Sequence, residues 1–151
     1  MNNALLRRRL VPAVLAGVLG LAGAMAAGQQ AATAAAGPIT TTLTPVSTTT
    51  TVGTPVTLIG TATNTTNATQ RVSMGIGFPS TVSYGGAVGD KCTIRHTVGL
   101  VYCGLNLAKG DTAKITLTVA PNVAGTSTLH SYARITYTND DNIAYATITA
   151  S

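Results

Sequence analysis

The chain has little of what most soluble folds use freely. Its 151 residues include no Glu and no Trp, one Phe, two Cys and only 9% charged residues. Coiled coils and long charged helices need Glu, Lys and Arg at helical spacing, so this composition excludes them. The low charge also excludes a disordered polyelectrolyte, and two Cys are too few for a disulfide-dense miniprotein. A single globular domain, with or without a tail, remains.

Basic residues are also scarce outside the N-terminal segment. The formal net charge is +5, but Arg7, Arg8 and Arg9 lie together near the N-terminus. From Gly37 to Ser151 there are six Lys or Arg and four Asp, a balance of +2. Nucleic-acid-binding surfaces concentrate many more basic side chains, so we expect no nucleic-acid partner.

The N-terminal segment has the layout of a secretory signal peptide. A basic stretch precedes an apolar stretch that begins at Leu10, and small residues follow. Cleavage fits after Ala26 or after Ala36, and strand-like sequence begins just beyond the later site. We therefore expect a helical signal peptide over 1–36, exported by the Sec or twin-arginine route, and one domain over 37–151. That domain would be secreted or cell-envelope associated, with no membrane contact after cleavage; a retained anchor is the alternative.

The remaining chain alternates apolar and polar residues at the period of a β-strand. It contains 27 Thr, and β-branched residues favour strands over helices. Over residues 54–64, one face would carry Val56, Leu58, Gly60 and Ala62. Further shared faces are Val72, Met74, Ile76 and Phe78; Ile115, Leu117 and Val119; Leu129, Ser131, Ala133, Ile135 and Tyr137; and Ala144, Ala146 and Ile148. The stretch from Ile39 to Leu43, before Pro45, is predicted to be an edge strand. The pattern predicts an all-β, antiparallel sandwich of about seven to eight strands, with a core of small and medium side chains.

Two cysteines flank a short segment that reads as a hairpin. The predicted pairs are Cys92 with Cys103, Ile94 with Val101, and Arg95 with Leu100. Residues 96–99 then form a four-residue loop, in which Gly99 is free to adopt a left-handed conformation. Both cysteines lie on one face, which predicts a Cys92–Cys103 disulfide in an exported protein. The spacing matches neither a zinc knuckle nor a CxxC redox motif.

The order of the segments resembles a bacterial family. The stretch TVGTPVTLIGTATNTT, from Thr51 to Thr66, is similar to the opening motif of the conserved repeat domain called domain of unknown function 11. The stretch from Cys103 to Ile135 is similar to that family's later Cys, Gly and Ala motifs. The resemblance, to the actinobacterial envelope and surface type, implies an Ig-like sandwich without a shared catalytic site. The sequence departs from the family pattern at Pro55 and Ile59-Gly60 in the opening motif, and at Ser131-Tyr132-Ala133 near the last strands.

The Gly-rich segment from Tyr84 to Asp90 is predicted as a mobile binding loop. It includes Gly85 and Gly86 and does not lead from a strand into a helix, so a phosphate-binding loop is not expected. Loops on a rigid sandwich commonly carry recognition, which makes Tyr84, Gly85, Gly86 and Asp90 the candidate binding residues.

A second candidate is the oxygen-rich run Asn139, Asp140, Asp141 and Asn142. These side chains could supply some ligands of a calcium ion, but the run lacks the spacing of an EF-hand. A solvated turn with side-chain-to-backbone hydrogen bonds is the simpler interpretation, so we predict no metal.

Catalysis is not expected. His96 and His130 are the only histidines, with His96 in the predicted loop and His130 on the outward face of its strand. No nucleophile motif accompanies them, so we predict surface histidines, no catalytic residue and no cofactor. Asn64 and Asn67 each begin an N-glycosylation pattern, but such patterns arise easily by chance in a Thr-rich chain, so the sequence leaves glycosylation open.

Two functions follow from these features. The first is an exported, non-catalytic Ig-like interaction or structural module, with a protein or glycan partner in the envelope or outside the cell. The second is a secreted small-ligand binder of the neocarzinostatin type, which has a comparable size but a second disulfide. A cleft lined by Phe78, Tyr84 and Tyr102 would favour the ligand binder.

Overall fold

The computed structural model describes residues 32–33, 37–138 and 141–151. The expected signal helix therefore lies outside the described residues, apart from 32–33. The strands are β1 (Ala32–Thr33), β2 (Ile39–Pro45), β3 (Thr49–Thr50), β4 (Val56–Asn64), β5 (Gln70–Gly77), β6 (Val82–Gly89), β7 (Arg95–Thr97), β8 (Leu100–Leu107), β9 (Thr112–Pro121), β10 (Gly125–Ile135) and β11 (Asn142–Ala150). Within this part of the chain, no helix is long and apolar enough to cross a membrane.

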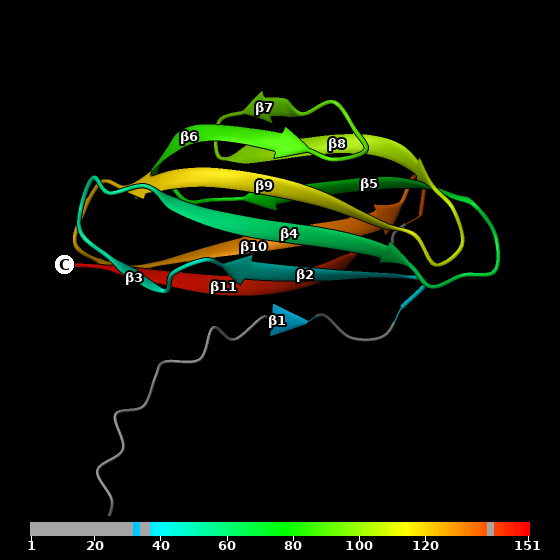
Figure 1. Ribbon diagram of the computed structural model, residues 1–151, viewed down its shortest axis with the longest axis horizontal. Coiled ribbons are helices and arrows are strands. Elements are labelled where there is room, and N and C mark those ends of the chain that lie inside the picture. Colours follow the sequence, from blue (N-terminus) through cyan, green and yellow to red (C-terminus); the bar gives the residue numbers. More distant parts are fainter. Residues whose placement is uncertain (1–31, 34–36, 139–140) are drawn as a thin grey trace, which may run out of the picture.

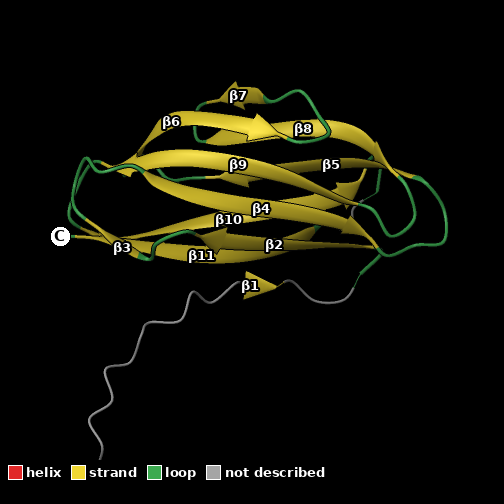
Figure 2. Ribbon diagram, in the orientation of Figure 1, coloured by secondary structure: helices red, strands yellow, loops and turns green. Residues whose placement is uncertain are grey.

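The strands form two sheets packed face to face (Figure 1). One sheet has the order β1-β2-β4-β9-β6 and the other the order β3-β11-β10-β5-β8-β7. All pairings are antiparallel except that of β3 with β11. Figure 2 shows strands joined by loops throughout the described residues. The all-β sandwich is confirmed, and the strands of seven or more residues match the predicted number.

The strand order is that of an immunoglobulin-type sandwich. In that fold one sheet runs A-B-E-D and the other G-F-C. Here β2-β4-β9-β6 occupies the first arrangement and β11-β10-β5 the second. Strand β8 adds to the second sheet beside β5, so the chain crosses between sheets after β6 and returns after β8.

The predicted strand faces account for the core. Burial alternates along the whole of β4, and Leu58 in its first half is fully buried. Strand β9 contributes its predicted face, and β5 contributes Val72, Met74 and Ile76 but ends at Gly77, before the partly buried Phe78. Fully buried core residues include Val72, Met74, Ile76, Ile115, Leu117, Val119 and Leu129. Among the described residues no aromatic side chain is buried, so the core consists of small and medium side chains as expected.

One predicted face is too long. Strand β10 ends at Ile135, and Tyr137 is 90% exposed instead of sharing the inward face. Its backbone φ is 73°, a left-handed conformation that takes the chain out of the strand. The Thr138 amide donates to the Ile135 carbonyl at 3.1 Å, which closes this turn.

A buried polar contact joins the two sheets. The hydroxyls of Thr41 on β2 and Ser131 on β10 lie 2.7 Å apart, and both residues are fully buried. The Thr41 hydroxyl also donates to the Thr61 carbonyl at 2.7 Å. A Cβ at Gly60 would stand 2.9 Å from the Ile76 Cδ1 atom and 3.4 Å from the Ser131 hydroxyl oxygen, so glycine leaves the room that this contact requires.

Candidate functional site

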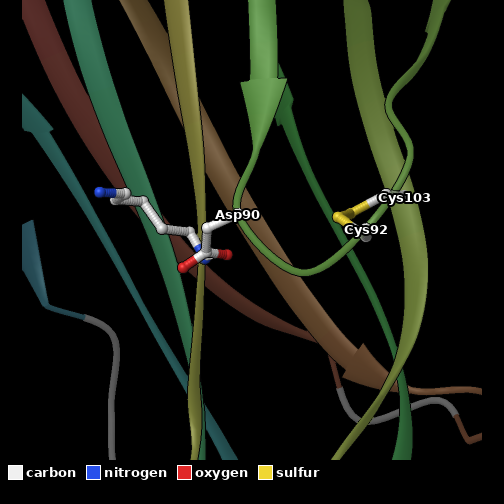
Figure 3. Close-up of a disulfide and its surroundings, with 4 residues drawn as sticks. Asp90, Cys92 and Cys103 are labelled. Atoms are coloured by element: carbon white, nitrogen blue, oxygen red, sulfur yellow. Dashed lines mark hydrogen bonds between the residues drawn. A yellow bond between two sulfur atoms is a disulfide. The ribbon is translucent and has the colours of Figure 1, made fainter.

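The disulfide forms as predicted. The sulfur atoms of Cys92 and Cys103 are 2.04 Å apart and their Cα atoms 6.0 Å apart. Cys103 lies on β8, whereas Cys92 lies in the linker that leaves β6 (Figure 3). A Cβ on Gly89 would stand 2.9 Å from the Cys92 sulfur, so the linker folds back directly over the end of β6. The bond therefore fixes the crossover from one sheet to the other.

The predicted hairpin register is wrong by two residues. Strand β7 pairs Arg95 with Tyr102, His96 with Val101, and Thr97 with Leu100. The loop between β7 and β8 therefore has only two residues, Val98 and Gly99. Gly99 has φ 73°, the left-handed conformation that tight two-residue hairpin turns need. The disulfide forms all the same, because Cys92 lies in the linker before β7 and reaches Cys103 on β8 from there.

The segment from Tyr84 to Asp90 is not a loop. Residues up to Gly89 form β6, which pairs with β9 and has a bulge between Tyr84 and Gly86. Backbone hydrogen bonds to β9 hold β6 in the sheet. Because β6 is rich in glycine and has no alternation of apolar and polar residues, the sequence did not indicate a strand here. The Oδ1 atom of Asp90 accepts a hydrogen bond from the Lys114 amide at 2.7 Å, which extends the pairing past the end of the strand (Figure 3).

The aromatic residues of the expected cleft do not line one cavity. The rings of Tyr84 and His96 are stacked with centroids 3.9 Å apart, and the Phe78 ring lies 6.3 Å from each. These rings join β6, at the edge of one sheet, to β7, at the edge of the other. Tyr102 lies instead on the outer face of the six-stranded sheet, because its neighbours Val101 and Cys103 are buried.

The acidic run is only partly described. Asn139 and Asp140 lie outside the described residues. An oxygen of Asp141 is 3.6 Å from a guanidinium nitrogen of Arg134, and Asn142 is the first residue of β11. In the part of the chain that the structure describes, no three His, Cys, Asp or Glu side chains are grouped to hold a metal.

A pocket of about 790 Å³ opens on the outer face of the six-stranded sheet. Two arginines, Arg71 on β5 and Arg95 on β7, line it together with Tyr102 on β8. The other lining residues are Ser73, Thr93, Gly104, Leu105, Asn106 and Thr136. This surface combines guanidinium donors, hydroxyl and amide groups, and an aromatic ring, which are the groups that orient a polar ligand.

The sequence reading missed this site. Its residues come from strands β5, β7 and β8, from the linker before β7 and from the turn after β10, and the strand register brings these segments together. Arg71 and Arg95 belong to no recognisable sequence motif. Tyr102 was predicted only as part of a cleft with Phe78 and Tyr84. The outward parity of Arg95 and Tyr102 in the predicted hairpin was the one usable signal.

Asn64 has a structural role. Its side chain is fully buried, and its Nδ2 atom donates to the carbonyls of Ala68, Leu107 and Ala108 at 2.8, 2.8 and 3.2 Å. Its Oδ1 atom accepts from the amide and the hydroxyl of Thr66 at 2.9 and 2.7 Å. The folded domain thus leaves the Asn64 amide no room for a glycan, whereas Asn67 is exposed.

Comparison with known proteins supports the fold and adds no family. No family model and no curated protein matches the chain. Among solved structures, BslA, described as a bacterial hydrophobin, is similar at a TM-score of 0.53 and 18% identity, over 76% of this chain and 95% of that one. A FixG-related protein from Vibrio parahaemolyticus is similar at 0.51 and 7%, over 77% and 99%.

Proposed function

We propose that the chain is an exported, non-catalytic Ig-like module that acts by surface contact in the cell envelope or outside the cell. The Cys92–Cys103 disulfide carries this proposal, because such bonds persist in oxidising compartments and are rare in the cytosol. The basic and apolar N-terminal segment supports the same compartment.

Surface contact is favoured over an enclosed binding site. The described core is filled by aliphatic side chains, and the Phe78, Tyr84 and His96 rings occupy the open side between the two sheets. The groups suited to recognition lie outside, on the face that holds Arg71, Arg95 and Tyr102. A rigid sandwich that presents an outer sheet face suits a binding or structural module.

We also propose membership of the conserved repeat family that the sequence resembles. Thr51–Thr66 spans β4 and ends at the turn that Asn64 organises. The later motif, Cys103–Ile135, spans β8 to β10 and includes the crossover between the sheets. The motifs therefore coincide with parts of the chain that shape the sandwich.

Cell fractionation of the native host tests the function. We expect the protein in the envelope fraction or the medium, with its two cysteines joined and its N-terminus after residue 26 or 36. N-terminal sequencing separates the two sites: cleavage after Ala26 retains β1, which pairs with β2, and cleavage after Ala36 removes it. Full-length protein in the cytosol with two free thiols would contradict the proposal.

A further inference from the structure

Strand register aligns a row of side chains across the outer face of the six-stranded sheet. Arg95 pairs with Tyr102, Tyr102 with Gly75, Gly75 with Tyr132, and Tyr132 with Ile143. The row crosses β7, β8, β5, β10 and β11. Neighbouring strands lie about 4.8 Å apart, so it extends over about 19 Å. An elongated ligand could contact several of these side chains at once.

A second row runs beside the first. Thr97 pairs with Leu100, Leu100 with Gly77, Gly77 with His130, and His130 with Tyr145. The rings of His130 and Tyr145 are 6.1 Å apart, and Tyr145 is 58% exposed. The two rows together bring three of the chain's five tyrosines onto one face.

Glycines beneath these rows keep the rings close to the backbone. A Cβ at Gly75 would stand 2.7 Å from the Cε1 atom of Tyr132, and one at Gly77 would overlap the His130 ring. The rings therefore occupy the space of the missing side chains. The rings of Tyr132 and His130 therefore lie directly over the glycine backbone of β5. A ring exposed in this way offers an apolar face to a flat ligand and, for Tyr, a hydroxyl at its edge.

Positive charge borders the aromatic rows. Arg71 and Arg95 line the pocket and, within the part of the chain that the structure describes, neither is ion-paired. Arg134 pairs with Ser73 across the strands and contacts Asp141 at 3.6 Å. Guanidinium groups bind carboxylate and phosphate groups through paired hydrogen bonds.

The other outer face has a different composition. On β2, β4 and β9 the half-exposed and exposed positions are mostly threonines, with Lys114 as the charged residue among them. Hydrogen bonds between neighbouring hydroxyls, such as Thr42 with Thr61 at 2.7 Å, occupy part of that surface. The concentration of rings and arginines is therefore a property of one face and not of the whole molecule.

We propose that the outer face of the six-stranded sheet binds an anionic polysaccharide, with sugar rings on Tyr102 and Tyr132 and acidic groups on Arg71 and Arg95. The row length fits about four sugar units at a spacing near that of the strands. The disulfide favours a glycan over a nucleic acid, because it indicates an oxidising compartment. This inference rests on the proposed function and specifies its partner.

Binding to defined polymers tests the proposal. The protein, expressed with export and purified with its disulfide intact, is titrated by calorimetry with polygalacturonate, a phosphorylated mannan, neutral dextran and an oligothymidylate of about 20 nucleotides. We expect binding to polygalacturonate or the phosphorylated mannan at least about tenfold tighter than to dextran, weakening as salt screens the charges. The preferred polymer identifies carboxylate or phosphate as the acidic group.

Matched variants locate the site. Replacing Arg71 and Arg95 by Ala, or Tyr102 by Ala, should each weaken binding about tenfold or more. Lys114→Ala removes a charge of the same sign from the opposite face and should leave binding within about twofold. Unchanged circular dichroism and melting temperature show that each variant is folded.

Several outcomes would overturn the proposal. These are failure to bind either anionic polymer, equal binding of dextran, tighter binding of the oligothymidylate, or an equal effect of Lys114→Ala. None of these would contradict export or location in the envelope. Conversely, cytosolic protein in the native host would contradict the proposed function even if the purified chain bound these polymers.

Discussion

At the scale of single residues, Asn64 shows how one side chain organises two turns. Its Nδ2 atom donates to the carbonyls of Leu107 and Ala108, near the β8–β9 turn. Its Oδ1 atom accepts from the Thr66 amide in the turn after β4. Its own carbonyl also accepts from the Gly110 amide at 2.9 Å. Backbone groups that would otherwise be buried without partners are thus hydrogen-bonded.

Loss of the Asn64 side chain should therefore be costly. We expect Asn64→Ala to lower the free energy of unfolding by about 2–4 kcal/mol, because the buried carbonyl of Leu107 and two part-buried carbonyls lose their donor. Asn67→Ala, three residues away and exposed, is the control and should change it by less than about 0.5 kcal/mol. Urea denaturation of both variants measures the difference. Equal stabilities would show that the Asn64 hydrogen bonds contribute nothing.

The glycines of the six-stranded face permit a similar comparison. Gly77→Ala should destabilise the fold by about 1–2 kcal/mol, because its Cβ would displace the His130 ring. Gly104→Ala lies on the same face, and its Cβ would stand 3.9 Å from the nearest atom, the Val72 carbonyl oxygen. That substitution should stay within about 0.5 kcal/mol of wild type. Thermal unfolding of the two variants checks this, and an equal loss would refute the role of the ring.

At the scale of elements, the disulfide is best understood through the linker that it holds. The chain leaves β6 in one sheet, passes Cys92 and enters β7 at the edge of the other. The stacked rings of Tyr84 and His96 cross the same gap. A covalent bond and a ring contact therefore join the two sheets at the same edge of the sandwich.

Replacing both cysteines by Ser should lower the free energy of unfolding by about 2–3 kcal/mol. The reason is that the unfolded chain regains the freedom of the segment between them. The melting temperature should fall by roughly 4–8 °C per kcal/mol, while binding well below it persists. Scanning calorimetry of the variant and of wild type measures the melting temperature and the free energy of unfolding. Wild type with reductant, in which the same bond is broken, serves as the control. Loss of binding at unchanged stability would instead assign the cysteines to a binding site.

Strand faces could be predicted from the sequence, whereas register and partners could not. Val56, Leu58 and Ala62 are buried as predicted, because alternation at period two is a local property of the chain. The glycine-rich β6 lacks that alternation and was predicted as a loop. The predicted register of the hairpin was wrong by two residues, because registers that differ by two place the same side chains on the same face.

At the scale of the molecule, the sandwich has one continuous core between chemically different outer faces. The core is aliphatic, so no single large side chain dominates it. The arginine and tyrosine face results from pairing among five strands, and residues distant in sequence meet there only after the sheet forms. For that reason sequence reasoning found the fold but missed the pocket that holds Arg71 and Arg95.

A continuous core should unfold as one unit. Leu117 on β9 is fully buried, so Leu117→Ala should cost about 2–5 kcal/mol. The transitions followed by circular dichroism and by tyrosine fluorescence should still coincide. Val88→Ala, at a site that is 70% exposed, should have little effect. Separate transitions for the two probes would show that the sheets unfold independently.

The placement of the first and last long strands has a mechanical consequence. Strand β2 begins at one end of the long axis, and the C-terminus after β11 lies at the other (Figure 1). A force applied between these points acts along the strands, while the hydrogen bonds of β2 with β4 and of β11 with β10 lie across them. The load would be shared as shear by whole ladders instead of opening them one bond at a time. The domain is therefore suited to stay folded under tension.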